Sequence, residues 1–132
     1  MTALPLTSLV TLLVILLMFA TAINVGRARQ RYGIQAPAVL GHEMFERAYR
    51  IQMNTLESAA MMLPALWLYA GLIGDRGAGL TGIIWLCARV WYAIAYQSNP
   101  SKREGGFILS FLAFAGLWLG ALWGVVRVMP LG

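Results

Sequence analysis

Charged and amide side chains recur at helical spacing in one stretch of the sequence, FERAYRIQMNTLE at residues 45–57. The residues that follow one another at intervals of four, four and three are Glu46, Arg50, Asn54 and Glu57. Side chains three or four residues apart lie on the same face of an α-helix. Arginine forks on such a face bind carboxylates in a bidentate manner. This stretch therefore predicts a site for an anionic, carboxylate-bearing ligand.

A second polar stripe occupies the segment ARVWYAIAY, residues 88–96. Arg89, Tyr92 and Tyr96 are spaced three and four apart, and Arg103 follows seven residues after Tyr96. This spacing puts guanidinium and phenol groups on one helix face. Tyrosine on its own is also typical of a membrane interface, so the prediction of a ligand site depends on the arginines.

The same charges could instead serve only to neutralise one another. Glu46 and Arg50 are spaced for an intrahelical ion pair. Arg89 could pair with Glu57 between helices, since pairing is the usual fate of charges inside a membrane. Such pairs would still leave arginines in excess, so we expect part of the set to bind a ligand.

The composition indicates an integral membrane protein. The 132 residues are 60% hydrophobic and 11% charged, against about 25% charged in soluble domains. A soluble domain of this size could not bury so much apolar surface. The length predicts a single domain over residues 1–132. The one cysteine, Cys87, excludes an intrachain disulfide and is expected to be a buried helix residue.

Four segments are long and apolar enough to cross a bilayer, because about 20 residues of helix span the hydrocarbon core. They cover residues 4–25, 44–73, 78–97 and 107–129. The sequence therefore predicts an all-α bundle of four transmembrane helices. The second segment would rise about 45 Å, more than the core thickness of about 30 Å, so its charged first half is expected to project beyond the hydrocarbon.

The basic residues predict how the chain is oriented in the membrane. Arg27, Arg29 and Arg31 follow the first segment, and Lys102 and Arg103 follow the third. With four spans, both groups lie on one side, and the positive-inside rule makes that side cytoplasmic, with both termini opposite. The net charge of +5 is therefore interpreted as a result of the orientation of the chain in the membrane and of binding to an anionic ligand. It is not interpreted as evidence of nucleic-acid binding.

The two stripes together resemble the MAPEG family, the membrane-associated proteins in eicosanoid and glutathione metabolism, over essentially the whole chain. The pattern E-R-x-x-R-x-x-x-N-x-x-E is met by Glu46, Arg47, Arg50, Asn54 and Glu57. The pattern R-x-x-Y-x-x-x-Y, with an arginine seven residues later, is met by Arg89, Tyr92, Tyr96 and Arg103. The resemblance implies a homotrimer that binds glutathione between neighbouring subunits near the cytoplasmic boundary.

By the same resemblance, particular side chains are expected at the glutathione site. Those that line it are Arg50, Gln52, Asn54, Glu57, Tyr92 and Tyr96. Arg103 is implied to stabilise the glutathione thiolate, which makes it the catalytic residue. One arginine after the first segment is also implied to bind glutathione, and Arg29 and Arg31 are both candidates. No metal site is expected.

The chemistry of glutathione agrees with these side chains. Glutathione carries two carboxylates and one ammonium group, so Glu57 suits the ammonium and Arg50 suits a carboxylate. A cation beside the thiol favours the thiolate, which is the reactive nucleophile. We therefore expect a microsomal-type glutathione S-transferase that conjugates glutathione to lipophilic electrophiles from the membrane lipid. A glutathione-dependent peroxidase activity would use the same thiolate.

Departures from the family pattern and two alternative functions bound this expectation. Ser58 stands where several members have an aromatic residue, and Met53 where a prostaglandin-synthase branch has arginine, so a general transferase is favoured. A non-catalytic lipid-binding or scaffold member of the same fold is the first alternative, and the retained Glu57 and Arg103 argue against it. A small multidrug exporter is the second, but residues 4–25 contain no acid.

Overall fold

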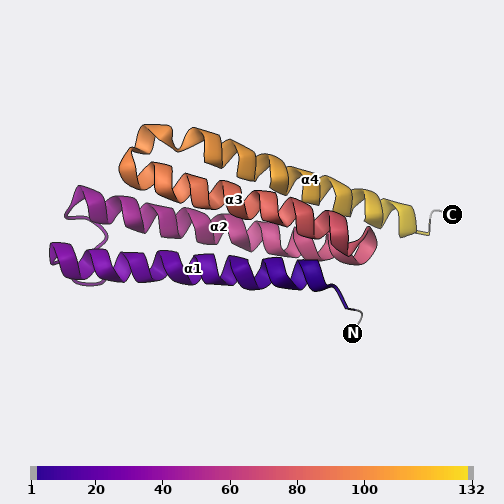
Figure 1. Cartoon of the computed structure of the whole chain (residues 1–132), viewed down its shortest axis with the longest axis horizontal. Coiled ribbons are helices and arrows are strands. Elements are labelled where there is room, and N and C mark those ends of the chain that lie inside the picture. Colours follow the sequence, from indigo (N-terminus) through magenta and orange to yellow (C-terminus); the bar gives the residue numbers. More distant parts are fainter. Residues whose placement is uncertain (1–2, 131–132) are drawn as a thin grey trace.

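The computed structural model describes residues 3–130, which fold only into helices and their connections. The four long helices are α1 (Pro5–Tyr32), α2 (Glu43–Leu72), α3 (Asp75–Ser98) and α4 (Glu104–Val128), and a short 3-10 turn, η1 (Pro100–Lys102), joins the last two. The helices lie side by side as a bundle, with both chain ends at one end (Figure 1). The connections α1–α2 and α3–α4 share the other end, which we call the basic end. The predicted all-α fold with four long helices is confirmed, whereas the length and composition needed to cross a membrane are found in three helical segments of the described residues.

The first helix is longer than the sequence predicts. The expected span covers residues 4–25, but α1 continues to Tyr32. Hydropathy marks where apolar residues stop, whereas a helix continues until a residue ends it. Gly33 ends α1 in the left-handed conformation, with φ of 66°. Arg29 and Arg31 therefore lie on the last turns of the helix and not in a loop.

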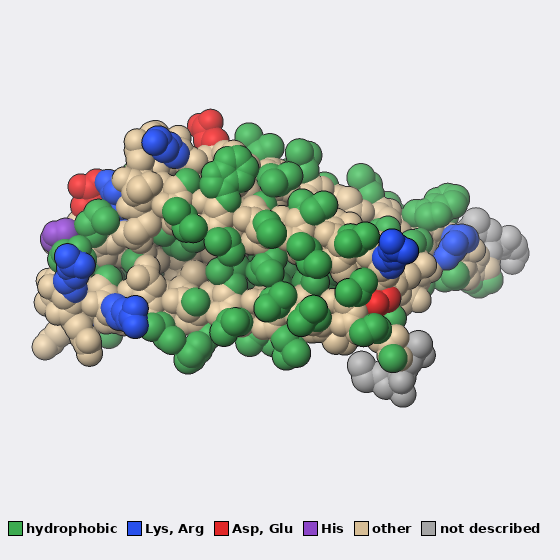
Figure 2. Space-filling model, viewed as in Figure 1, with side chains coloured by type: hydrophobic (Ala, Val, Ile, Leu, Met, Phe, Trp, Pro, Cys, Tyr) green, Lys and Arg blue, Asp and Glu red, His purple; other side chains and the backbone are tan. Residues whose placement is uncertain are grey.

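Three helical segments are long and apolar enough to cross a membrane. They are α1, α3 and the segment Pro100–Val128, which contains α4. The first half of α2 carries charged residues, and α2 is not among the helices that are apolar enough to cross a membrane. Figure 2 shows hydrophobic side chains over the middle of the visible face and charged side chains toward both ends. This distribution suits a bilayer with polar headgroups at each end of the bundle.

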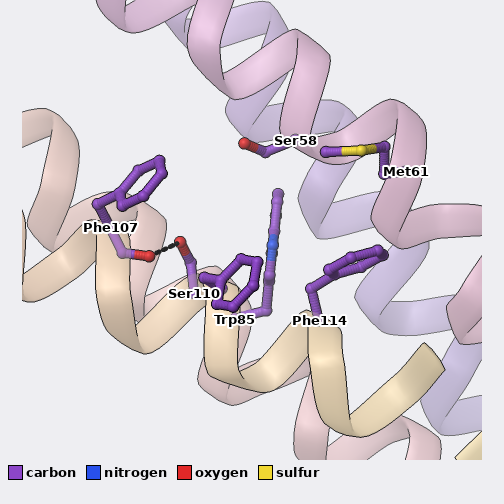
Figure 3. A pocket seen from close by; sticks show the side chains of 7 residues that line it. Ser58, Met61, Trp85, Phe107, Ser110 and Phe114 are labelled. Carbon is purple, nitrogen blue, oxygen red and sulfur yellow. Dashed lines mark hydrogen bonds between the residues drawn. The ribbon is translucent and has the colours of Figure 1, made fainter. Parts of the chain in front are cut away.

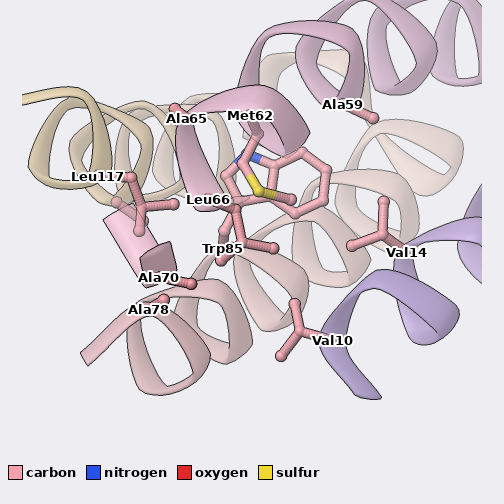
Figure 4. Packing of buried hydrophobic residues seen from close by; sticks show 11 residues of the cluster. Val10, Val14, Ala59, Met62, Ala65, Leu66, Ala70, Ala78, Trp85 and Leu117 are labelled. Carbon is pink, nitrogen blue, oxygen red and sulfur yellow. The ribbon is translucent and has the colours of Figure 1, made fainter. Parts of the chain in front are cut away.

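The centre of the bundle is packed around Trp85 of α3, which is 1% exposed. Met62 and Leu66 of α2, Val10 of α1 and Leu117 of α4 belong to the same buried cluster (Figure 4). All four helices thus contribute to one core. Their faces are fixed relative to one another, which holds the polar stripes of α2 and α3 in register.

Polar contacts fasten α1 to its neighbours near the end opposite the basic end. The Asp75 carboxylate, at the start of α3, accepts hydrogen bonds from the backbone N–H groups of Leu6 at 3.1 Å and Thr7 at 2.9 Å. It thereby satisfies donors that the first turn of α1 cannot satisfy within the helix. Trp67 of α2 donates its indole N–H to the Thr11 hydroxyl of α1 at 3.0 Å.

Glycines let α4 approach its neighbours closely, as at Gly106 and Gly120. A Cβ at Gly106 would lie 2.6 Å from the backbone nitrogen of Tyr92, and a Cβ at Gly120 would overlap the ring of Tyr69. A Cβ at Gly116 would meet no atom within 4 Å in the described part of the chain. The α3–α4 contact at Gly106 therefore depends on the absence of a side chain.

Candidate active site

A polar pocket opens where α2, α3 and the start of α4 meet. Its volume is about 330 Å³, and it is lined by Arg50, Met53, Asn54, Glu57, Tyr92, Tyr96 and Arg103. All of these except Met53 are residues that the sequence predicts for the site. Helical spacing brings the α2 members to one face and the α3 tyrosines to another, and the bundle places the two faces together. The structure therefore confirms the proximity, while the role of each residue stays a prediction.

Arg103 is held at the pocket by the turn that precedes α4. Its guanidinium donates to the carbonyl oxygen of Pro100 at 3.0 Å and lies 5.8 Å from the centre of the Tyr96 ring. The Tyr96 and Tyr92 rings are in turn 5.6 Å apart. Arg103 itself is exposed, so a cation stands at the mouth of the pocket beside two phenol rings.

Arg89 is fully buried next to the pocket, with 0% exposure. It donates to the side-chain oxygen of Asn54 at 2.7 Å, and to the hydroxyls of Thr55 and Ser110 at 3.4 Å each. Its guanidinium also lies 4.1 Å from the centre of the Tyr92 ring. A buried cation is costly unless it is compensated. Here the compensation comes from uncharged oxygens and an aromatic ring.

The hydrogen bond from Arg89 determines the orientation of the Asn54 side-chain amide. A guanidinium has only donors, so the Asn54 oxygen must face it. The Asn54 NH₂ group, with two donors, is then left for the pocket. Arg89 thereby fixes the orientation of the Asn54 amide at the pocket.

The ion pairs of the self-neutralising alternative are not formed among residues 3–130. Glu46 accepts a hydrogen bond from the backbone N–H of Gly41 at 3.3 Å and does not pair with Arg50. Arg89 bonds to neutral oxygens and not to Glu57. Arg50 and Glu57 are both exposed at the pocket, so charges of both signs remain open to a ligand.

Arg47, although part of the family motif, has a structural place at the start of α2. It forms an ion pair with Glu43 at 2.6 Å. It also donates to the backbone carbonyls of Gln97 at 2.9 Å and Ser98 at 3.2 Å, at the end of α3. Arg47 thereby fastens α2 to α3 at the basic end.

Three residues expected at the site do not reach this pocket within one chain. Gln52 is not among its lining residues. Arg29 donates to the carbonyl of Ala38 at 2.8 Å and lies 4.9 Å from the centre of the Phe45 ring. Arg31 lines a separate pocket. A single subunit therefore does not bring these three residues to the site. α1 contributes no residue to this pocket, and Gln52, two residues after Arg50, points to a different side of α2.

An adjoining pocket of about 290 Å³ continues the site along α4. It is lined by Asn54, Tyr92, Arg103, Glu104 and Phe107. Reasoning from polar spacing missed Met53, Glu104 and Phe107. Glu104 could have been predicted at the site, because it is a charged residue directly after Arg103. Met53 and Phe107 could not, because the sequence pattern does not distinguish them from the many other apolar residues.

Phe107 also borders an apolar pocket further into the bundle. This pocket of about 80 Å³ is lined by Ser58, Met61, Trp85, Phe107, Ser110, Phe111 and Phe114. Figure 3 shows their side chains, with the Ser110 hydroxyl bonded to the Phe107 carbonyl oxygen, a distance of 2.9 Å. Because Phe107 lines both, the polar site and the apolar pocket are neighbours.

Comparisons with known proteins agree with the arrangement of these residues. Residues 7–123 match the MAPEG family. An uncharacterized protein of Synechocystis is 44% identical over 115 residues, which are 87% of this chain and 84% of that protein. Microsomal glutathione S-transferase 2 of Homo sapiens is 35% identical over 102 residues, 76% of this chain and 69% of that protein. Leukotriene C4 synthase of Cavia porcellus is 33% identical over 110 residues, 83% of this chain and 71% of that protein. The match across most of its length shows, as the two motifs indicated, that this chain belongs to the MAPEG family.

Proposed function

We propose that this protein is a membrane-bound glutathione transferase that adds the glutathione thiolate to lipophilic electrophiles. The observation that most supports the proposal is the pocket at which Arg50, Glu57 and Arg103 meet without ionic partners among residues 3–130. Glutathione has the complementary charges, and relatives of this chain are named as glutathione-using enzymes.

The ammonium group and one carboxylate of glutathione each have an oppositely charged partner at the pocket. Glu57 binds the ammonium group, and Arg50 binds one carboxylate as a bidentate fork. The NH₂ group of Asn54 donates to a second oxygen, and the hydroxyls of Tyr92 and Tyr96 complete the set. This assignment uses every polar side chain of the pocket except Arg103, which is left for the sulfur.

Arg103 stabilises the thiolate. A cation beside a thiol lowers its pKa, and the thiolate is the nucleophile. A shift of about two pKa units corresponds to about 2.7 kcal/mol. The thiol proton goes to water, the sulfur lone pair forms the C–S bond, and the leaving group departs with its own bonding electrons. With a lipid hydroperoxide the same thiolate would attack the outer peroxide oxygen and release the lipid alkoxide, which takes up a proton. A second glutathione would then convert the resulting sulfenic acid to glutathione disulfide and water.

The electrophile arrives from the apolar side. The pocket that Phe107 shares with the polar site is lined mainly by aromatic side chains of α3 and α4. Lipophilic molecules partition into the bilayer around these helices. An electrophile that enters there meets the sulfur held beside Arg103, without leaving the apolar phase.

The active form is a homotrimer, with the site closed by a neighbouring subunit. In one chain Arg50, Glu57 and Arg103 are exposed, which leaves the charges screened by water. A neighbour would cover them and could supply Gln52 and an arginine from α1, Arg29 or Arg31. The site and the basic end face the cytoplasm, and both termini lie on the opposite side.

A conjugation assay tests the proposal. Detergent-solubilised protein is mixed with glutathione and a panel that contains an aryl halide, a fatty-acid epoxide and a lipid hydroperoxide. We expect turnover of at least one, which Arg103→Ala abolishes. Lys102→Ala, which removes the neighbouring exposed cation outside the pocket, retains turnover. No reaction with any of the panel, in protein that binds glutathione, would favour a non-catalytic member of the fold.

A further inference from the structure

A second basic pocket lies at the basic end, between α1, α2 and α3. Its volume is about 350 Å³, and it is lined by Asn24, Arg27, Ala28, Arg31, Tyr32, Met44, Ala48 and Gln97. It shares no residue with the pocket that contains Arg103. Arg29 does not line it, so with Arg29 as the α1 arginine that closes the neighbouring glutathione site, the proposed transferase reaction leaves this pocket without a ligand.

The depth of this pocket matches the headgroup region of a bilayer. α1 has 28 residues, and about 20 residues of helix cross the hydrocarbon core. The last two turns of α1, from about Asn24 onward, therefore extend past the hydrocarbon. Arg27 and Arg31 are about one turn apart on this part of the helix, so both side chains lie on the same face of α1.

Neither arginine forms an ion pair with an acid among residues 3–130. The one ion pair in the described part of the protein joins Arg47 to Glu43. Arg31 lies 5.7 Å from the centre of the Tyr32 ring, which orients it but does not cancel its charge. Two unpaired guanidinium groups in one pocket favour a phosphate, which accepts several charge-assisted hydrogen bonds.

The remaining lining suits the rest of a phospholipid headgroup. Met44 and Ala48 of α2 give the pocket an apolar wall. Gln97 of α3 donates to the carbonyl of Met44 at 3.3 Å, and its own side-chain oxygen is buried with no hydrogen-bond partner among residues 3–130. That oxygen can accept a hydrogen bond from a headgroup hydroxyl.

We propose that this pocket binds the phosphodiester of an anionic phospholipid, with Arg27 and Arg31 on the phosphate and Gln97 on a headgroup hydroxyl. Basic pockets between membrane helices are a known means of binding anionic headgroups. Arginines whose only role was to set the orientation of the chain in the membrane would not need to line one pocket together, as Arg27 and Arg31 do. The lipid joins α1 to α2 and α3, so it stabilises the bundle.

Thermal unfolding in nanodiscs tests the proposal. The midpoint Tm is followed by tryptophan fluorescence in phosphatidylcholine nanodiscs that contain increasing fractions of phosphatidylglycerol. Wild-type protein is expected to gain Tm as the fraction rises. In Arg27→Gln, the phosphatidylglycerol fraction that gives half of the Tm gain should be about tenfold higher or more. A hydrogen bond to a charged group contributes about that factor to binding affinity. Arg27 is exposed, so Arg27→Gln folds, and each variant is compared with its own value in phosphatidylcholine.

Lys102→Gln is the matched control. It removes one positive charge at the same end, from an exposed residue outside the pocket. General attraction to an anionic surface changes by at most about fivefold per charge, so this variant keeps most of the gain. An equal loss in Arg27→Gln and Lys102→Gln would overturn the proposal. A gain produced by inorganic phosphate in detergent, without phosphatidylglycerol, would overturn the assignment to a lipid.

Discussion

The substitution Gly106→Ala tests whether the close approach of α3 and α4 shapes the active site. A Cβ at Gly106 would lie 2.6 Å from the backbone nitrogen of Tyr92, and 2.8 Å from both its Cα and the carbonyl oxygen of Ala88. Carbon atoms in contact are normally about 3.5–4.0 Å apart. These neighbours are backbone atoms of a packed helix, so the start of α4 must move away by about 1 Å.

The expected cost combines two opposing terms. Overpacking of this kind costs about 1–3 kcal/mol. Replacing glycine with alanine within a helix returns up to about 1 kcal/mol, and less near a helix start. The net loss for Gly106→Ala is therefore about 1–2 kcal/mol, or a fall in Tm of roughly 3–10 °C. Gly116→Ala meets no atom within 4 Å among residues 3–130 and keeps the gain.

The effect on activity should exceed the effect on binding. Gly106 lies three residues after Arg103, and its contact is with Tyr92, which lines the site. A displacement of about 1 Å at a reacting group can lower the rate by about a hundredfold. We therefore expect kcat to fall by about tenfold or more. The affinity for glutathione should fall by a smaller factor.

Differential scanning fluorimetry and steady-state kinetics on Gly106→Ala and Gly116→Ala, in the same detergent, give both readouts. If Gly106→Ala is as stable and as active as Gly116→Ala, the α3–α4 contact does not position Arg103, and the account of the site is wrong.

Four further substitutions separate binding from stability. Glu57→Gln should raise the Kd for glutathione about tenfold by loss of the ammonium partner, with kcat retained; calorimetry that finds an unchanged Kd would contradict the assignment. Asn54→Ala removes the nearest acceptor of the buried Arg89 and should cost about 1–3 kcal/mol of stability. Asn54→Asp keeps the acceptor but loses the NH₂ donors, so it should stay stable and bind glutathione weakly; equal binding by Asn54→Asp and wild type would refute the donor role. Asp75→Asn should lower the free energy of unfolding by about 1 kcal/mol, since the N–H groups of Leu6 and Thr7 bond to different carboxylate oxygens and the amide NH₂ that replaces one of them cannot accept; no change relative to Arg76→Gln would show that this cap is not stabilising.

Periodicity was sufficient to predict part of the polar set that lines the pocket. Spacing of three and four residues places Arg50, Asn54 and Glu57 on one side of α2, independently of how the helices pack. All three line the pocket. The partners of Arg89 could not be predicted in the same way. A fully buried arginine suggests a carboxylate partner, but the register between helices puts Asn54, Thr55 and Ser110 next to it.

Hydropathy misplaced features that depend on three-dimensional packing. It ended the first helix at the first charges, although α1 continues to Gly33. The expectation that Cys87 is buried is wrong, since it is exposed on α3. Cysteine packs readily in cores, but which side of an apolar helix faces outward is decided by its neighbours and not by its composition.

The most direct test of the central claim is the ultraviolet absorbance of the glutathione thiolate, at about 240 nm, when glutathione is added to purified protein at neutral pH. The account predicts a new absorbance in wild-type protein that Arg103→Ala loses, although calorimetry shows that the variant still binds glutathione. The same absorbance in both proteins, or none in wild-type protein that binds glutathione, would contradict the role of Arg103 and with it the proposed reaction.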